Sequence, residues 1–440
     1  MEAALAKDTP ESNAPFLPEP TTVAAVGLDY GMLLDITLKT VYFGGRPSAR
    51  AICDRICLPF SVMEEILDYL RRQELIEIVG SGGIIEQDYQ YGLTSKGVSR
   101  TQEILEQNLY VGAAPVPFAL YEKVVAQQSI AHLQVTPQKL AAAFENLVLD
   151  AETVEQIGTA VGSGRSVFLY GPPGNGKSTI AECIAALLSE EINVPYAIDV
   201  NGQIIRIHDP RVHLEPDGGM AHEKEVVGSI ANIRAGRDRR WAISRRPLVI
   251  GGGEITLSDL DLRYSPASKF YIAPMQLKAN NGVLVVDDFG RQLMRPEEML
   301  NRWMVPMDRG IDHLVFQTGE TVTIPFDVLL VFATNLTPSQ LGDEAFFRRI
   351  RHKVRIGDPD TKLFKDILTR SAAARSLSYD EDATDYLIET YYRETGRPFR
   401  GVHPRDLLDL IEDFARFRGE APQYDKGWLD RACRSYFVED

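Results

Sequence analysis

A glycine-rich stretch decides how the middle of the chain folds, and it reads Gly171-Pro172-Pro173-Gly174-Asn175-Gly176-Lys177-Ser178-Thr179. It fits the pattern G-x-x-x-x-G-K-[ST], in which glycines let successive backbone N–H groups surround phosphate oxygens. The apolar run 166–170 before it predicts a strand, and the residues after it, as far as Leu188, predict a helix whose N-terminus attracts anions. Because the pattern requires this context, the sequence predicts a phosphate-binding loop rather than a chance glycine-rich turn.

Two side chains of the loop predict its ligand. Lys177 supplies a positive charge for the β- and γ-phosphates of a nucleotide, and Ser178 offers a hydroxyl group to Mg²⁺. We therefore predict that Gly171–Thr179 binds ATP together with Mg²⁺.

A pair of acids follows a second apolar run, 283–286. Ligands of parallel sheets bind at the carboxyl ends of the strands, where Asp287 and Asp288 would lie. We expect Asp287 to hold Mg²⁺ through its water shell and Asp288 to polarise the attacking water. Taken alone, the two acids would merely end a strand; the phosphate-binding loop favours the catalytic interpretation.

Two weaker signals follow further along the chain. A third apolar run, 328–332, is followed by Asn335, which is suited to orient water near a γ-phosphate but is also a common turn residue. Arg348 and Arg349 precede the apolar Ile350, and by themselves they fit a solvated helix end.

In this order along the chain, these motifs resemble the Walker A loop, Walker B strand, sensor 1 asparagine and arginine finger of AAA+ ATPases. The resemblance covers roughly Leu140 to the C-terminus. It implies a parallel α/β ATPase domain at 136–358 and a homo-oligomeric ring, expected to be a hexamer, with ATP between subunits. It also implies that Arg349 reaches the neighbouring subunit's γ-phosphate, with Arg348 as the alternative.

The resemblance extends to a C-terminal helical lid at 359–440. The patterns predict helices over 362–375, 381–393, 405–418 and 426–437. Arg405 opens one of these helices after a glycine-containing loop, as the sensor 2 arginine of the family does, and Arg400 is the alternative. A salt bridge at the helix start also explains Arg405.

A predicted β-hairpin indicates which group of AAA+ proteins the chain resembles. Residues 314–316 and 321–325 flank a polar turn, similar to the pre-sensor-1 β-hairpin of MoxR-like, helicase-loader and enhancer-binding AAA+ proteins, although a plain meander also fits. The chain departs from the family in having Asp-Asp rather than Asp-Glu at 287–288, which suggests slow turnover. It also has an unusually long separation, 287 − 177 = 110 positions, between Lys177 and Asp287.

The extra length predicts an insertion at about 204–275. A metal site there is disfavoured, because the spacing fits no zinc motif; its candidates are His208, Asp209, His213, His222 and Glu223. Six arginines with Trp241 fit subunit-interface salt bridges first and nucleic acid or an acidic partner second; they are Arg234, Arg237, Arg239, Arg240, Arg245 and Arg246. Phe270 and Tyr271 fit a central-channel loop and a buried core equally well.

The N-terminal part divides into three segments. Residues 1–24 are proline-rich and predict a disordered tail. Residues 25–112 predict a helix–turn–helix followed by strand–loop–strand and a last helix, an order that resembles an α+β winged-helix domain. Residues 113–135 contain Pro115 and Pro117 and predict a linker.

The composition limits the kinds of partner that the chain is expected to bind. The chain has 440 residues and a net charge of −15, which disfavours indiscriminate nucleic-acid binding. Within 21–110, eight basic residues oppose twelve acidic ones. Glu64, Glu65 and Asp68 lie on the second helix of the predicted helix–turn–helix, about 61–72, which would enter the major groove in a DNA-binding version. No run is long enough to span a membrane. The absence of a signal-peptide pattern and the four scattered cysteines predict the cytoplasm.

The sequence therefore predicts an ATP-driven ring that remodels a protein client recruited by the winged-helix domain. A DNA-acting loader or initiator is one alternative. A slow nucleotide-dependent switch, suggested by the Asp-Asp pair, is another.

Overall fold

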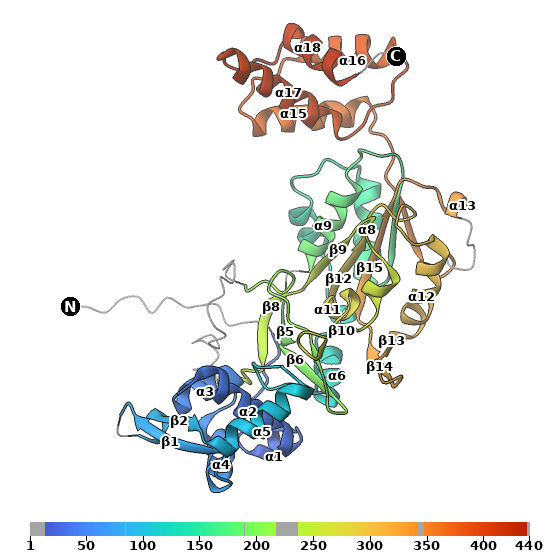
Figure 1. The fold of residues 1–440 in the computed structure, drawn as a ribbon. Coiled ribbons are helices and arrows are strands. Elements are labelled where there is room, and N and C mark those ends of the chain that lie inside the picture. Colours follow the sequence, from blue (N-terminus) through green and yellow to red (C-terminus); the bar gives the residue numbers. More distant parts are fainter. Residues whose placement is uncertain (1–13, 84, 189, 217–235, 342–346, 438–440) are drawn as a thin grey trace, which may run out of the picture.

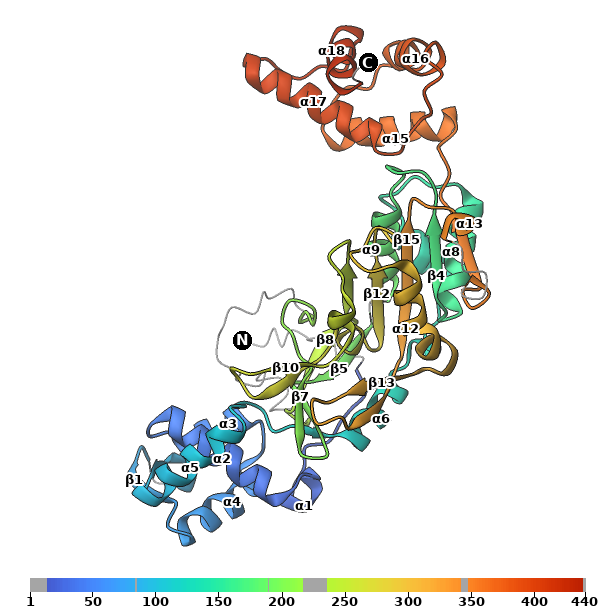
Figure 2. The same cartoon turned by 45° about the vertical axis from the view of Figure 1, so that its right-hand side comes forward.

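The structure is a computed structural model that describes residues 14–83, 85–188, 190–216, 236–341 and 347–437. Both views show an elongated chain, with the N-terminal helices at one end, the C-terminal helices at the other and the sheets between them (Figures 1 and 2). Among the described residues, no helix combines the length and apolar character that crossing a bilayer requires.

A parallel five-stranded sheet forms the middle of the chain. Its strands, in spatial order, are β16 (His352–Arg355), β4 (Val167–Tyr170), β15 (Val328–Thr334), β12 (Gly282–Val286) and β9 (Leu248–Gly251). Each central strand is a short apolar run because both of its faces are buried. The predicted parallel α/β fold is therefore confirmed.

Alternate residues of these strands face two different cores. Val167, Val283 and Val331 pack on α8 (Ala151–Gly162) and α9 (Lys177–Leu187). On the other face, Phe168 and Phe332 pack on Trp303 of α12 (Pro296–Arg309). The short α7 (Pro137–Ala143) adds Leu140 to the first core.

The C-terminal helices, which we call the lid, have a hydrophobic core of their own. They are α15 (Thr361–Ala374), α16 (Glu381–Ile388), α17 (His403–Arg418) and α18 (Lys426–Tyr436). A turn of π-helix at Glu389–Arg393 continues α16. The helical pattern expected for this region is confirmed.

A second, mixed sheet lies between the parallel sheet and the N-terminal helices (Figure 2). Its strand order is β10 (Arg263–Ser265), β11 (Phe270–Ile272), β7 (Gln203–Arg206), β6 (Ala197–Val200) and β3 (Val116–Pro117). Two antiparallel pairs share its core: β5 (Glu191–Pro195) with β8 (Trp241–Arg245), and β13 (Ile311–Val315) with β14 (Thr321–Pro325).

This second sheet changes two expectations. The stretch 113–135, expected to be a linker, contains β3 and α6 (Phe118–Gln127), and Tyr121 and Val124 are buried in the shared core. Phe270 and Tyr271 are buried in β11, so the core interpretation holds and the channel-loop interpretation is wrong. The expected β13–β14 hairpin is present. Phe316, which directly follows β13, packs its ring against Tyr271 of β11.

The N-terminal helices surround their own core. The order is α1 (Val23–Val26), α2 (Tyr30–Gly44), α3 (Ala49–Ile56), α4 (Phe60–Arg72), the hairpin β1 (Ile76–Ser81) with β2 (Tyr89–Leu93), and α5 (Ser95–Gln107). This is the order of elements that we expected; assignment as a winged-helix domain stays a prediction.

Part of the expected disordered tail is ordered. Residues 14–20 lie along the segment 236–238, where the Glu19 amide donates to the Gly236 carbonyl at 2.9 Å and the Asp238 amide donates to the Leu17 carbonyl at 2.8 Å. The Arg237 guanidinium lies over the Phe16 ring. The prediction of a disordered tail is therefore wrong for 14–20, because backbone groups distant in sequence form hydrogen bonds with this segment.

The described arginines of the insertion are used inside the chain. Arg240 is buried, forms an ion pair with Asp238 at 2.8 Å and donates to the carbonyls of Val26 and Pro115. Arg239 pairs with Asp54 of α3 at 2.7 Å. These contacts fasten the N-terminal helices to the segment directly before β8, which removes the reason to place Arg239 and Arg240 at a subunit or nucleic-acid interface. Arg234 lies outside the described residues.

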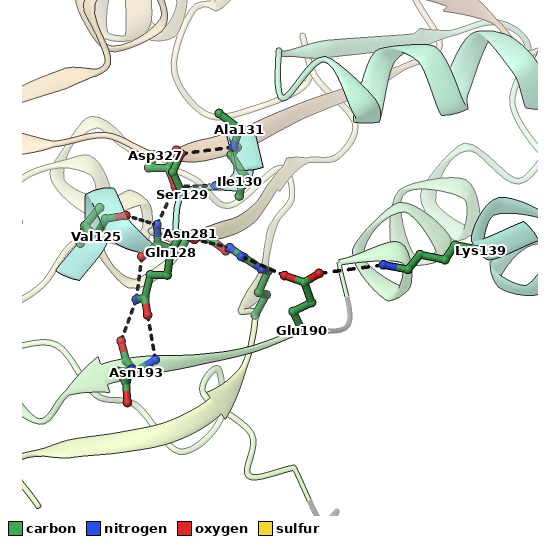
Figure 3. Close-up of polar contacts among 11 residues, drawn as sticks. Val125, Gln128, Ser129, Ile130, Ala131, Lys139, Glu190, Asn193, Asn281 and Asp327 are labelled. Carbon is green, nitrogen blue, oxygen red and sulfur yellow. Dashed lines mark hydrogen bonds and ion pairs between the residues drawn. The ribbon is translucent and has the colours of Figure 1, made fainter. Parts of the chain in front are cut away.

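A buried polar network joins β5 and the end of α6 to the amino edge of the parallel sheet (Figure 3). Gln128, just after α6, donates to the Asn193 carbonyl and to the Asn281 Oδ1, both at 2.9 Å. Asn281 donates to the Asp327 carboxylate at 2.6 Å, and that carboxylate also accepts the Ile130 amide. Because Asn281 and Asp327 directly precede β12 and β15, the network fixes the amino edge of the parallel sheet.

We predict that Arg240→Ala destabilises the attachment of the N-terminal helices. The substitution removes the guanidinium that pairs with Asp238 and donates to two carbonyls, and breaking a buried ion pair in this way costs about 3–5 kcal/mol. Urea denaturation should show a lower midpoint, and limited proteolysis should cut within 108–115. Arg245→Ala is the matched control, because Arg245 is exposed and, among the contacts described, its side chain donates only to the Pro216 carbonyl. Equal midpoints for both variants would contradict the prediction.

Candidate functional site

The phosphate-binding loop connects β4 to α9, as the sequence predicts. Gly171 has a φ of +143°, and a Cβ atom there would lie 2.1 Å from the Ile356 carbonyl oxygen, so only glycine fits beside β16. The loop is open to solvent along part of its length; its exposed residues are Pro173, Gly174, Gly176, Ser178 and Thr179.

Lys177 lies over the loop. Its Nζ donates to the carbonyls of Gly171 at 3.0 Å and Pro172 at 2.8 Å. Burial lowers the pKa of Lys177, while the carboxylates of Asp287 and Asp288 oppose this shift. Lys177 therefore lies close enough to both acids at the carboxyl edge of the sheet for their charges to act on it.

Ser178 and Asp287 are in direct contact. The Ser178 hydroxyl donates to the Asp287 Oδ2 at 2.6 Å, across 109 positions of sequence. These oxygens are hard donors of the kind that Mg²⁺ prefers, so the pair fits the predicted metal-binding role. The Asp287 amide donates to the Gly251 carbonyl of β9, which fixes the end of β12.

Asp288 and Asn335 follow the ends of two neighbouring strands. Asp288 is exposed, has a φ of +48°, and its amide donates to the Asp287 Oδ1 at 2.9 Å. Asn335 follows Thr334, which pairs with Tyr170 directly before the loop. Parallel register therefore brings Asn335 to the same edge as Asp287 and the loop.

Arg349 does not lie beside the phosphate-binding loop of its own chain. Its Nε donates to the Asp308 carboxylate of α12 at 2.8 Å, and it precedes His352, which pairs with Val167 at the start of β4. The phosphate-binding loop follows the other end of β4. Arg349 thus lies towards the amino edge of the sheet, away from the loop of its own chain, and Arg348 beside it is also exposed.

The structure distinguishes the two lid arginines. Arg405 is exposed and pairs with the adjacent Asp406 at 3.2 Å. Arg400 pairs with Asp358, and its charge contributes to the lowered pKa of Lys177. Arg400, the alternative, is therefore the arginine beside the loop, and a Cβ atom at Gly174 would lie 3.8 Å from the Arg400 Cβ.

Asn175 belongs to a contact that the sequence did not reveal. Its carboxamide donates to the Gly357 carbonyl and the Asp358 carboxylate, and accepts from the Gly401 amide. Position 175 is unrestricted in the loop pattern, so nothing in the sequence marked this side chain.

The histidines of the insertion form no metal site among the residues that the structure describes. His213 accepts the Asp209 amide at Nδ1 and donates to the Lys278 carbonyl from Nε2, both at 2.9 Å, which occupies both ring nitrogens. Across the described residues, no group of three or more His, Cys, Asp or Glu side chains is arranged to hold a metal. His222 and Glu223 lie outside those residues.

Comparisons with known proteins give partial matches. A family described as a domain of unknown function (DUF8689) matches residues 360–435, within the lid. A putative ABC transporter ATP-binding protein of Photobacterium profundum is 22% identical over 227 aligned residues, covering 45% of this chain and 39% of that protein.

Solved structures match over a larger share of the chain. NtrX of Brucella abortus in complex with ADP is 15% identical, with a TM-score of 0.40, covering 69% of this chain and 59% of NtrX. The RuvB Holliday junction branch migration motor of Thermotoga maritima is 15% identical, with a TM-score of 0.39, covering 69% of this chain and 74% of RuvB. The chain thus spans less than two thirds of the curated relative and of NtrX.

We predict that His208 makes the folded state less stable as the pH falls. Burial lowers the pKa of His208 to about 4 from its usual 6.5. Between these values the unfolded chain takes up a proton that the folded chain does not, so stability falls by about 1.4 kcal/mol per pH unit between roughly pH 6.5 and 4 and levels off below. Across this pH range, the melting temperature should depend less steeply on pH in His208→Phe than in wild type. The exposed His132→Phe variant should retain the wild-type slope, and an unchanged slope in His208→Phe would refute the prediction.

Proposed function

We propose that this chain is a Mg²⁺-dependent ATPase of the AAA+ kind that acts as a ring and remodels a protein client. The observation that carries the proposal is the Ser178–Asp287 contact at 2.6 Å, directly beside Lys177. The loop serine, the strand-end acid and the lysine are the groups that a bound nucleotide and its cation require at one place. The name of the curated ATP-binding relative points in the same direction.

The loop and its neighbours would share the work of holding the nucleotide. Backbone N–H groups of Gly171–Thr179 and the Lys177 ammonium bind the phosphates. Ser178 and Asp287 would hold Mg²⁺, which neutralises charge on the phosphate oxygens when bound. Lys177 exchanges its two carbonyl partners for phosphate oxygens.

Asp288 is proposed to polarise the attacking water, with Asn335 helping to orient it. The αL backbone at 288 gives a physical reason for aspartate here. Short side chains that bond to nearby backbone tolerate positive φ better than glutamate does. The shorter carboxylate reaches less far, which supports slow turnover and keeps the nucleotide-dependent switch as a second candidate.

Arg349 is proposed to complete the site of a neighbouring subunit, with Arg348 as the alternative. Its position towards the amino edge supports action between subunits rather than within one. A ring, proposed to be a hexamer, repeats this contact. Within the chain, Arg400 is better placed than Arg405 to meet the phosphates, because it lies beside Lys177.

The N-terminal helices are proposed to bind a protein client rather than DNA. The exposed side of α4 carries Glu64 and Glu65 near its start, and Asp68 pairs with Arg71, which reduces the positive charge available for phosphates. This favours the remodeller over the DNA-acting alternative. All four cysteines are free thiols, which supports the reducing cytoplasm as the location.

We predict that Asp288→Asn binds ATP with nearly wild-type affinity but hydrolyses it at least about 100-fold more slowly, because water activation is lost while Asp287 still serves Mg²⁺. Lys177→Ala should lose ATP binding, because it removes the cation facing the phosphates. Fluorescent-nucleotide titration and phosphate release measure the two effects. Asp382→Asn, on the exposed start of α16, is the control. Equal hydrolysis by wild type and Asp288→Asn would remove Asp288 from the mechanism.

We predict that Arg349→Ala lowers hydrolysis on the order of 10³-fold while ATP binding persists, because the arginine acts on the adjacent subunit. Mixing Arg349→Ala with Asp288→Asn subunits should restore part of the activity at mixed interfaces. Arg348→Ala in parallel identifies which arginine acts. Wild-type turnover by Arg349→Ala alone would exclude this residue as the finger.

A further inference from the structure

Asn175 connects the phosphate-binding loop to the lid through its side chain. The Asn175 Nδ2 donates to the Gly357 carbonyl at 2.9 Å and to the Asp358 Oδ1 at 2.8 Å, both in the segment between β16 and α15. The Asn175 Oδ1 accepts the amide of Gly401, just before α17, at 2.9 Å. The residue is 8% exposed, so these bonds are shielded from water. We call this set the loop–lid contact.

The backbone supports the same contact. The Val402 amide donates to the Gly174 carbonyl at 2.7 Å. A Cβ atom at Gly174 would lie 2.8 Å from the Val402 Cγ1, so the start of α17 is packed against the loop. Movement of either partner is therefore transmitted to the other at short range.

The chemistry of the carboxamide suits this position. A carboxamide presents donors and an acceptor at opposite corners, and here the donors meet two oxygen acceptors while the oxygen meets an N–H group. Aspartate would place a second carboxylate against Asp358, and a hydroxyl side chain would satisfy only part of the set. Asp358 also pairs with Arg400, so the contact ties this lid cation to the loop.

We propose that Asn175 is a positioning residue that couples occupation of the phosphate-binding loop to the orientation of the lid. This inference rests on the proposed nucleotide site. The side chain faces the lid and the segment between β16 and α15, so it is not itself a phosphate ligand. Phosphates that order the loop backbone also order the Asn175 carboxamide and the Gly174 carbonyl. These two groups then hold Gly401, Val402 and Arg400 more firmly.

The test is hydrogen–deuterium exchange of the full chain, without nucleotide and with ADP as the probe. In Asn175→Ala without nucleotide, the amides of 400–402 should exchange about tenfold faster than in wild type, because the lost hydrogen bonds no longer oppose local opening of this segment. Amides of α9 should be unchanged. Asn146→Ala, at an exposed asparagine in a turn, is the matched control.

Added ADP should slow exchange at 400–402 in wild type, and this response should be lost in Asn175→Ala at ADP concentrations that saturate the variant in its own ADP titration. Asn175→Ser should recover part of the response, because its hydroxyl retains part of the hydrogen bonding. Wild-type exchange at 400–402 in Asn175→Ala, or a retained ADP response, would overturn the inference while leaving the nucleotide site intact. If wild type binds no ADP, the coupling and the proposed function both fail, and the nucleotide-free comparison still decides whether the loop–lid contact exists.

Discussion

The parallel pairing of β4, β15 and β12 is the constraint on which the site depends. Val286 pairs with Phe332, and Phe332 pairs with Phe168. This register ends the three strands together, so the loop after Tyr170, the acids after Val286 and Asn335 meet at one edge. Burial of both strand faces holds the register, because a slip of one residue would exchange the two cores.

The opposite edge of the same sheet serves a different purpose. There Asn281 and Asp327 join the network of Gln128 and Asn193, which attaches α6 and the β5–β8 pair. The β5–β8 pair is in turn fastened to the N-terminal helices by the buried Arg240, which directly precedes β8. Buried hydrogen-bonded groups are costly to separate, so the N-terminal helices are held firmly relative to the amino edge, while the carboxyl edge stays open for a ligand.

The lid meets the parallel sheet through a narrower set of contacts. Its own helices bury a separate core, while Asn175 and Gly174 bond to its residues Gly401 and Val402. A separate core lets the lid move as a unit, and the few polar contacts determine where it rests. This division between a firmly attached N-terminal part and a lightly attached lid is what a nucleotide-driven machine of the proposed kind needs.

The sequence by itself determined the parallel sheet, the phosphate-binding loop and the acids that face it, because these features depend on local patterns and on strand ends. It also determined the helices of the lid from their apolar periodicity. Only the tertiary structure decided the rest. Arg240 and Tyr271 are buried, 113–135 is part of a sheet core, and Arg400 rather than Arg405 lies beside Lys177. Each of these outcomes depends on a partner distant in sequence, and a local pattern carries no information about which distant segment will cover it.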